Sequence, residues 1–271
     1  MATREINAVL SQKIEVAPGL IVIRVAPDGW ELGPFKPGQY AVLGLPGSAP
    51  RCEGSDADEP ELPPDKVIPR AYSIASSSRP GEYLEFYIAL VRSGALTPRL
   101  FNLNIGDRLW LSEKMLGNFT LEKIPTDAHI VMVATGTGLA PYMSMVRTYL
   151  SENTGQQMAV IHGARHSWDL GYRSELEALQ QISPFLTYIP IISRVADEPA
   201  PWKGASGYVQ DVWTERLIKK YWGFSPKPNH THVFLCGNPA MIAAMEKVLQ
   251  ADRFVENTKK QPGQYHVEKY W

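Results

Sequence analysis

The pattern of the sequence changes near residue 126, and that change constrains the fold more than any other feature. Up to about residue 125, short apolar runs typical of strands are broken by glycine and proline: GLIVIRVAP, GQYAVLGLPG, RAYSIASS, YLEFYIALV and DRLWLSEKM. Such spacing predicts an antiparallel barrel or sandwich. From His129 on, apolar strands alternate with turns and helices, which predicts a parallel sheet covered by helices on both faces. We therefore expect two domains, residues 1–125 and 126–271.

The composition is that of an ordinary soluble protein. The chain has 271 residues, 44% of them hydrophobic and 20% charged, which is enough for two hydrophobic cores. Its first ten residues carry charges of both signs and lead into no long apolar stretch, so the sequence predicts neither a signal peptide nor a membrane span. We expect a cytoplasmic monomer with no nucleic-acid or membrane partner.

The two cysteines, Cys52 and Cys236, lie far apart in the sequence. Two thiolates cannot supply the four ligands of a typical iron–sulfur cluster or structural zinc site. Any redox centre is therefore expected to be organic, and no metal site is predicted.

Negative charge is concentrated between Arg51 and Lys66, in RCEGSDADEPELPPDK. This segment holds six acids and two bases, so its net charge is −4 against −1 for the whole chain, which leaves +3 on the remainder. Its prolines and turn formers predict a surface loop, called the acidic loop below. Solvation is the commoner role of such a run, and the sequence assigns this one no binding role.

A glycine-rich turn follows the first strand of the second half. In VMVATGTGLAPYMSM the strand ends at Thr135, the turn contains Gly136, Thr137 and Gly138, and Pro141 occupies the first turn of the predicted helix. Glycines there let a phosphate-bearing ligand approach the positive end of a helix dipole, as in dinucleotide sites. For this motif alone, a turn that needs glycine only for its backbone angles remains the alternative.

The ends of the next two strands favour a dinucleotide site and one type of coenzyme. The strand ending in HGARH carries Arg165 and no acid to hold a ribose 2′-hydroxyl, and the following strand ends with Ser193 and Arg194. Two guanidinium groups at neighbouring strand ends suit a 2′-phosphate, so NADP(H) is favoured over NAD(H). Tyr208 can offer an aromatic face to adenine, although ordinary packing is its simpler role when it is taken alone.

A further strand ends in FLCGNPAMI, which places Cys236 and Gly237 before a helix that Asn238 or Pro239 can start. This is again the carboxyl edge of the predicted parallel sheet, where ligands bind in open α/β folds. Taken by itself, Cys236 is better explained as a buried structural cysteine.

The first half contains residue types suited to a flavin. Arg70, Tyr72 and Ser73 supply a cation for a pyrophosphate, an aromatic plate for the isoalloxazine ring and a polar group for N5. Strand alternation puts Arg70 and Tyr72 on one face and Ser73 on the other, so a bend or a backbone contact must bring Ser73 to the ring. Downstream, Thr97 and Pro98 of SGALTPRLFNL are consistent with a second phosphate-binding helix start or with a simple capped helix.

From about Phe35 to Trp271 the sequence resembles the ferredoxin/flavodoxin–NADP reductase family of the bacterial, FAD-containing type. The matching pieces, in order, are PGQY, RAYS, SGALTPRL, ATGTGLAP, HGAR, ISR, CGNPAMI and the terminal YHVEKYW. Their order and spacing are far more specific than any one of them. The resemblance implies an antiparallel FAD-binding β-barrel followed by an NADP(H)-binding α/β domain.

The resemblance also implies roles for individual residues. In the FAD site, the segment from Arg70 to Ser73, which includes Ala71, would hold the flavin. Tyr72 would stack on the isoalloxazine, Arg70 would meet the pyrophosphate, and Ser73 would lie near N5. The pyrophosphate would also be faced by the backbone amides of Ala95, Leu96 and Thr97. In the NADP(H) site, Thr137 would lie between the flavin and the nicotinamide, and Cys236 would lie by the nicotinamide. Gly136 and Gly237 would also contact NADP(H), and its 2′-phosphate end would be held by Arg165, Ser193, Arg194 and Tyr208.

The last residues resemble the tails of bacterial and plant-type members. Tyr270 would cover the open face of the flavin, Trp271 would meet the adenine of a folded FAD, and Glu268 would have a proton-relay or hydrogen-bonding role near N5. Packing of the tail onto the barrel is the alternative. Ser73, Cys236, Glu268 and Tyr270 are thus the expected catalytic residues.

The expected activity is that of a ferredoxin–NADP(+) reductase: hydride transfer between NADP(H) and FAD, coupled to one-electron exchange with a ferredoxin or flavodoxin. One alternative is an NAD(P)H-dependent flavin or quinone reductase, or the reductase component of an oxygenase, on the same two domains. Another is a nucleotide-binding module that keeps the fold but binds no flavin. The physiological acceptor and the direction of electron flow are left open by the sequence.

Overall fold

The computed structural model of the chain describes residues 5–152 and 155–269. It contains two compact units: the first is Met1–Thr120 with Met143–Thr148, and the second is Leu121–Tyr142 with Tyr149–Trp271. Within the described residues, no helix is both long and apolar enough to span a membrane, and no group of three or more His, Cys, Asp or Glu side chains could hold a metal ion.

The first unit is built from antiparallel strands in the spatial order β4-β3-β6-β1-β2-β5. Their bounds are β1 (Ala8–Ala17), β2 (Leu20–Pro27), β3 (Tyr40–Pro46), β4 (Val67–Ser73), β5 (Leu84–Ala89) and β6 (Arg108–Leu111), with helix α1 (Thr97–Asn102) between β5 and β6. Ile74, directly after β4, forms an antiparallel bridge with Phe86 of β5. Because β4 and β5 are the two outer strands, this bridge closes the sheet into a barrel.

The barrel interior is filled by one apolar cluster. Leu10, Ile23, Leu43, Leu84 and Phe86 come from four different strands, and all of them are fully buried. The alternation of side chains along each strand sends these residues inward and their neighbours outward. The predicted antiparallel barrel is therefore confirmed.

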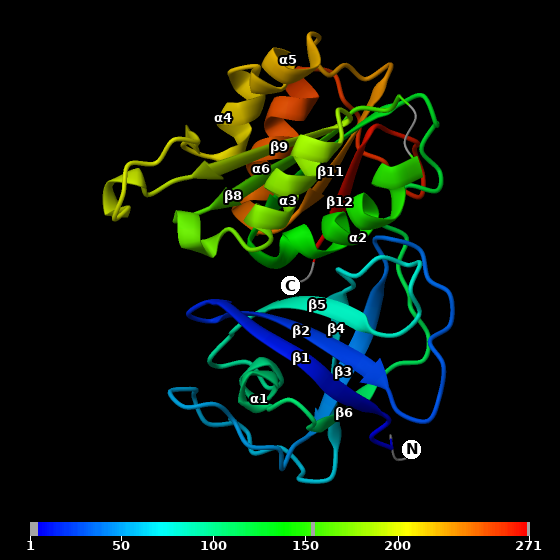
Figure 1. Cartoon of the computed structure of the whole chain (residues 1–271), viewed down its shortest axis with the longest axis vertical. Helices are drawn as coiled ribbons and strands as arrows, with labels where there is room; N and C mark the ends of the chain where they lie inside the picture. Colours follow the sequence, from blue (N-terminus) through cyan, green and yellow to red (C-terminus); the bar gives the residue numbers. More distant parts are fainter. Residues whose placement is uncertain (1–4, 153–154, 270–271) are drawn as a thin grey trace. The chain divides into compact units, whose positions relative to one another are not determined.

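The second unit is a parallel sheet in the order β10-β9-β8-β7-β11-β12 (Figure 1). Its strands are β7 (His129–Thr135), β8 (Met158–Ala164), β9 (Leu186–Ile192), β10 (Ala205–Ser206), β11 (Thr231–Cys236) and β12 (Tyr265–Glu268), and its helices are α3 (Arg173–Ile182), α4 (Val209–Thr214), α5 (Leu217–Trp222) and α6 (Pro239–Ala251). Helix α2 (Ala140–Tyr149) connects β7 to β8, and its residues Met143–Thr148 are grouped with the first unit. The predicted parallel α/β sheet is confirmed.

The order of the strands reverses between β7 and β11. The chain moves from β7 outward through β8, β9 and β10, and then returns to the other side of β7 as β11. Right-handed crossovers place the helices before and after such a reversal on opposite faces, and α2 and α3 lie across the sheet from α4, α5 and α6 (Figure 1). In open α/β sheets, the carboxyl ends of the strands on either side of the reversal form the usual ligand crevice.

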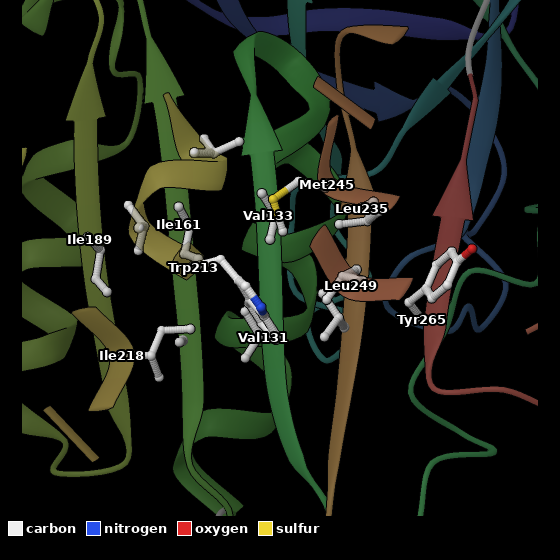
Figure 2. Packing of buried hydrophobic residues seen from close by; sticks show 14 of the residues in the cluster. Val131, Val133, Ile161, Ile189, Trp213, Ile218, Leu235, Met245, Leu249 and Tyr265 are labelled. Atoms are coloured by element: carbon white, nitrogen blue, oxygen red, sulfur yellow. The ribbon is translucent and has the colours of Figure 1, made fainter. Parts of the chain in front are cut away.

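The face that carries α4, α5 and α6 holds a large apolar core. Val131, Val133 and Ile161 point from the central strands toward Trp213 and Met245 of the helices (Figure 2). Each of these side chains is at most 3% exposed. Removing a buried aromatic such as Trp213 typically costs about 3–5 kcal/mol, so this core keeps the strand ends of the second unit in fixed positions.

Several elements of the structure were not evident from sequence pattern. Strand β1 contains the mostly polar run SQKIE, which masks the alternation of apolar and polar residues. Helices α4 and α5 are only six residues long each, which is too short for a clear helical pattern. Strand β12 was expected to be part of a tail; it pairs in parallel with β11, from Val233 opposite Tyr265 to Cys236 opposite Glu268. Its formation depends on a neighbour about thirty residues earlier, which no local pattern reveals.

Candidate functional site

Two turns meet at the point where the strand order reverses. The turn after β7 begins a short 3-10 helix at Gly136–Leu139 that runs into α2, and the turn after β11 contains Gly237 and Asn238 before α6. The backbone N–H of Asn238 donates a hydrogen bond to the Oγ1 of Thr135 at 2.9 Å. The predicted meeting of the GTG and CGN motifs at one sheet edge is therefore observed in the second unit.

Two glycines make this contact sterically feasible. A Cβ placed on Gly138 would lie 2.3 Å from the carbonyl oxygen of Cys236, and a Cβ placed on Gly237 would lie 2.3 Å from the Oγ1 of Thr135. Gly237 also has a φ of +140°, which residues with a side chain rarely adopt. Both turns thus require glycine because the two backbones approach closely, a feature expected where a phosphate-bearing ligand lies on backbone amides.

The turn after β7 leaves room on its outer side. A Cβ placed on Gly136 would meet nothing within 4 Å, and this residue has a φ of +55°. The backbone here is therefore accessible to a ligand, while Gly138 on the inner side is packed against β11. Pro141 is the second residue of α2, and Asn238 caps α6 by accepting a hydrogen bond from the N–H of Ala240 at 2.8 Å, as the sequence indicated.

The predicted 2′-phosphate residues lie together beyond β8 and β9. The N–H of Arg194 donates to the carbonyl of Arg165 at 2.9 Å, and the N–H of Ser193 donates to the carbonyl of Ala164 at 3.1 Å. The side chains of Arg165, Ser193 and Arg194 are exposed. In the part of the chain that the structure describes, neither guanidinium forms an ion pair, so two cations at adjacent strand ends are available to an anion.

Tyr208 lies at the start of α4, close in sequence to the end of β10. The residue is 63% exposed, and its backbone N–H donates to the Oδ2 of Asp211 at 2.7 Å. The N–H of Gly207 donates to the carbonyl of Ile192 at the end of β9, which brings this segment to the same edge of the sheet. An exposed ring at this position is not part of the core, so ordinary packing does not explain it.

A set of polar contacts that sequence reasoning missed ties the two arginine loops together. The His166 ring stacks on Trp168, and its Nδ1 and Nε2 lie 3.2 Å and 3.3 Å from carboxylate oxygens of Asp169 and Asp197. The N–H of Ser167 donates to Glu198 at 2.8 Å, and hydrogen bonding by Ser167, chiefly through its side chain, lowers the pKa of that carboxyl. The polar run HSWD after a buried strand was the available signal. These contacts hold Arg165 and Arg194 on neighbouring loops of defined shape.

Cys236 and Glu268 lie side by side in the strand register. Cys236 pairs with Ala134 of β7 on one side and with Glu268 of β12 on the other. The cysteine is fully buried, whereas Glu268 is partly exposed at the end of the last strand. The sheet therefore brings a thiol and a carboxyl to the same edge as the glycine turns.

In the first unit, the predicted flavin residues lie on β4. Arg70 and Ala71 are exposed, Tyr72 is partly buried, and Ser73 is buried at the end of the strand. The Tyr72 ring meets Phe86 edge to face, with ring centroids 6.4 Å apart. Burial raises the pKa of the Tyr72 phenol, an effect that the charge of Arg70 partly opposes, so the hydroxyl stays protonated at neutral pH.

The second predicted phosphate segment has unpaired donors. Among the described residues, the backbone N–H groups of Ala95, Leu96 and Thr97 donate no hydrogen bond. The Thr97 hydroxyl is occupied, because it both accepts from the N–H and donates to the carbonyl of Val91, each at 3.0 Å. Any anion held here would therefore bind to backbone amides, as the resemblance implies.

Tyr270 and Trp271, the predicted aromatic cover, lie outside the described residues. The remaining predicted residues thus form two groups, one on β4 and the Ala95–Thr97 turn in the first unit, and one at the carboxyl edge of the sheet in the second.

Residues 132–247 match the family model of the oxidoreductase NAD-binding domain. The chain is 32% identical over 241 residues to the flavodoxin/ferredoxin–NADP reductase of Buchnera aphidicola subsp. Baizongia pistaciae (strain Bp), covering 89% of each protein. It is 29% identical over 245 residues to the ferredoxin–NADP reductase of Azotobacter vinelandii, covering 87% of this chain and 86% of that one.

The fold agrees with these sequence matches. A ferredoxin NADP+ reductase from Neisseria gonorrhoeae, crystallised with bound FAD and NADP, matches the full length of both chains with a TM-score of 0.80 at 22% identity. Since a relative with 32% identity spans nearly all of both proteins, the chain belongs to the flavodoxin/ferredoxin–NADP reductase family, a family of oxidoreductases.

Proposed function

We propose that this chain is an FAD-dependent reductase that transfers hydride between NADP(H) and FAD and exchanges single electrons with a ferredoxin or a flavodoxin. The observation that carries this proposal is the close contact between the Gly138 and Gly237 turns at the strand-order reversal, with the Arg165 and Arg194 guanidinium groups at the neighbouring strand ends. Family membership supplies the class of reaction, and this geometry fits the coenzyme.

The second unit fits NADP(H) through its donor set. Arg165 and Arg194 would bind the 2′-phosphate, Ser193 would add a hydroxyl, and the exposed ring of Tyr208 would lie on the adenine. The glycine turn after β7 would let the coenzyme approach the backbone of Gly136 and Thr137, where no Cβ intervenes at Gly136. NADP(H) is favoured because the site offers cations and the strand end offers no acid for a free 2′-hydroxyl.

The first unit fits FAD through Arg70, Tyr72 and the Ala95–Thr97 turn. The turn has three backbone N–H groups without a partner among the described residues, which suits a pyrophosphate. The exposed guanidinium of Arg70 would add charge, and the Tyr72 ring would support the isoalloxazine with its phenol neutral. FAD, when bound, accepts or donates hydride at N5 and passes its electrons on singly.

The chain itself binds, orients and protects the reacting groups. Thr137, Cys236 and Gly237 would position the nicotinamide at the carboxyl edge, and Glu268 beside Cys236 would hold or move a proton. Ser73 would donate a hydrogen bond near N5 from its buried position at the end of β4. Tyr270 and Trp271, which lie outside the described residues, would cover the flavin and its adenine.

An absorption spectrum and an anaerobic titration test the proposal. The purified protein should be yellow, and NADPH should bleach its flavin absorption with one equivalent per flavin. The reduced enzyme should then reduce an isolated ferredoxin or flavodoxin faster than free FMN or a quinone. A colourless preparation that binds no added FAD would refute the flavin assignment, and preference for free FMN would instead favour a flavin reductase.

A further inference from the structure

The acidic loop forms most of the connection between β3 and β4, so it leads directly into the strand that carries Arg70 and Tyr72. Most of its acids are exposed, including Glu53, Glu59 and Glu61. Asp58 differs from them because its side chain is only 16% exposed and lies between two arginines. Solvation therefore explains the loop's charge in general but not the position of this carboxylate.

Asp58 is the counter-ion of a buried arginine. Its Oδ2 lies 2.5 Å from the Nη2 of Arg99, and its Oδ1 lies 3.3 Å from the Nη1 of the same guanidinium. The Arg99 side chain is 3% exposed. A second cation, the Nη1 of Arg51, lies 2.6 Å from the Oδ1 of Asp58. This bonding holds the pKa of the Asp58 carboxyl below its usual value, with the hydrogen bond from Arg99 as the largest cause.

The same guanidinium joins the acidic loop to the Ala95–Thr97 turn. Arg99 Nη1 donates to the carbonyl of Ala95 at 2.6 Å, and Nη2 donates to the carbonyl of Gly47 at 2.6 Å. Arg99 thus connects three segments: the end of β3, the middle of the acidic loop and the turn before α1. Because the Ala95 carbonyl is held by Arg99, the backbone N–H groups that follow it are fixed on this turn without an internal partner.

Further contacts align the loop with this region. The N–H of Cys52 donates to the carbonyl of Pro98 at 2.9 Å, and Arg92 Nη1 donates to the carbonyl of Gly54 at 2.6 Å. The carbonyl of Arg92 in turn accepts from Arg51 Nη2 at 2.8 Å. The first part of the acidic loop is therefore hydrogen-bonded along residues 92–99 and does not extend freely into solvent.

Loss of the Asp58 charge would leave Arg99 as an uncompensated buried cation. Such an ion is costly, so the guanidinium would turn toward water and release the carbonyls of Ala95 and Gly47. The turn would then lose the bond that fixes the direction of its amides. A binding site made of backbone N–H groups depends on exactly that direction, because amides cannot be reoriented by a side-chain rotation.

We propose that Asp58 is a positioning residue for the cofactor: through Arg99 it holds the Ala95–Thr97 turn in the conformation that binds the FAD pyrophosphate. The acidic loop thereby links the segment that meets the phosphates to the strand that meets the ring. This inference rests on the proposed function, because it assumes that the turn binds FAD.

The test compares Asp58→Asn with Glu61→Gln in the full-length holoenzyme. Both variants remove one negative charge from the acidic loop, but only Asp58 contacts a buried cation. FAD dissociation constants follow from the rise in FAD fluorescence as each holoenzyme is diluted. We expect the constant to rise about tenfold or more in Asp58→Asn, as for loss of a charged hydrogen bond, and to stay unchanged in Glu61→Gln. The FAD dissociation constant of Asp58→Glu, which keeps a carboxylate, should be closer to that of the original protein than the constant of Asp58→Asn.

Hydrogen exchange gives a readout that a general loss of stability would not produce. In Asp58→Asn, amide exchange should accelerate in residues 91–99 while the strands of the second unit keep their protection. Arg51→Gln, which removes only the outer cation, should shift both measurements in the same direction and by less, and it serves if Asp58→Asn does not fold. Unchanged FAD binding in Asp58→Asn and in Arg51→Gln would overturn the inference. Faster amide exchange across the whole barrel of Asp58→Asn would overturn it as well.

Failure of the inference can be distinguished from failure of the proposed function. If the unmodified protein binds FAD and Asp58→Asn binds it equally well, only the role of Asp58 is wrong. If the unmodified protein binds no FAD, the proposed function itself fails.

Discussion

The backbone N–H of Asn238 and the side-chain hydroxyl of Thr135 form a 2.9 Å hydrogen bond that joins the end of β11 to the end of β7. These two strands are neighbours in the sheet but lie about a hundred residues apart in the chain. The bond lies at the strand-order reversal, where the two glycine turns are in contact. The nucleotide site that we propose depends on this contact.

Gly138→Ala should damage that contact. Its Cβ would lie 2.3 Å from the carbonyl oxygen of Cys236, a backbone atom that cannot move aside cheaply. We expect the free energy of unfolding to fall by about 1–3 kcal/mol, as for overpacking, and the KM for NADPH to rise. Urea denaturation and steady-state kinetics measure the two effects. Gly81→Ala is the control, because a Cβ there meets nothing within 4 Å; equal behaviour of both variants would contradict the prediction.

Arg165→Ala and Arg194→Ala should each weaken NADPH binding by about 1.5–3 kcal/mol, the usual size of a hydrogen bond to a charged group. Binding of NADH should barely change, because NADH lacks the 2′-phosphate. Titration of each variant with both nucleotides measures the difference, with the exposed Lys220→Ala as a control for loss of a surface charge. Equal losses for the two nucleotides would show that these arginines do not read the 2′-phosphate.

Removal of Tyr270 and Trp271 should change the preference between NADPH and NADH. The resemblance places these residues over the flavin and its adenine, where the nicotinamide and the terminal tyrosine would compete for one face. Ratios of kcat/KM for the two nucleotides, before and after deletion, measure the effect. Unchanged ratios would remove the tail from the mechanism.

The stability of the second unit should decrease in mild acid because of His266. The Nε2 of His266 lies 3.0 Å from the Nδ1 of His232, and its ring stacks on Phe234. Burial, aided by His232, lowers the pKa of His266 to about 4 from its ordinary value of 6.5. The unfolded chain therefore takes up a proton near pH 6.5 that the folded chain refuses until about pH 4.

The folded state is therefore disfavoured as the pH falls from 6.5 toward 4, and the full effect of one such histidine is on the order of 3 kcal/mol. Unfolding free energies measured in urea between pH 7 and pH 4 should fall less steeply in His266→Gln than in the original protein. Parallel pH profiles for the two proteins would show that His266 does not titrate in this way.

The chemistry of the second unit was largely predictable from local sequence. A glycine turn directly after a buried strand, and arginines directly after the next two, are short-range patterns whose positions are set by the strands that precede them. Parallel strands place their carboxyl ends on one edge, so the backbone contact between Arg194 and Arg165 follows from the order of the elements. The contacts of His166 and Ser167 with Asp197 and Glu198 were not predictable, because they join two loops about thirty residues apart.

The chemistry of the first unit was less predictable from local sequence. RAYS could be recognised as a candidate flavin segment, but nothing in the local sequence distinguishes Asp58 from the five other acids of its loop. Its pairing with Arg99 over forty-one positions exists only once the barrel has brought α1 against the β3–β4 connection. Likewise β12 is a strand because β11 offers it an open edge, and its own four residues do not require that conformation.

The sequence by itself thus determined the fold class, the family and the residue types at the strand ends, because periodicity, glycine turns and strand-end cations act over a few neighbouring residues. The tertiary structure decided which acid has a buried partner, which strand completes the parallel sheet and which two glycines must lack a side chain. Those features depend on distances between segments that are remote in the chain, and burial makes each of them energetically decisive.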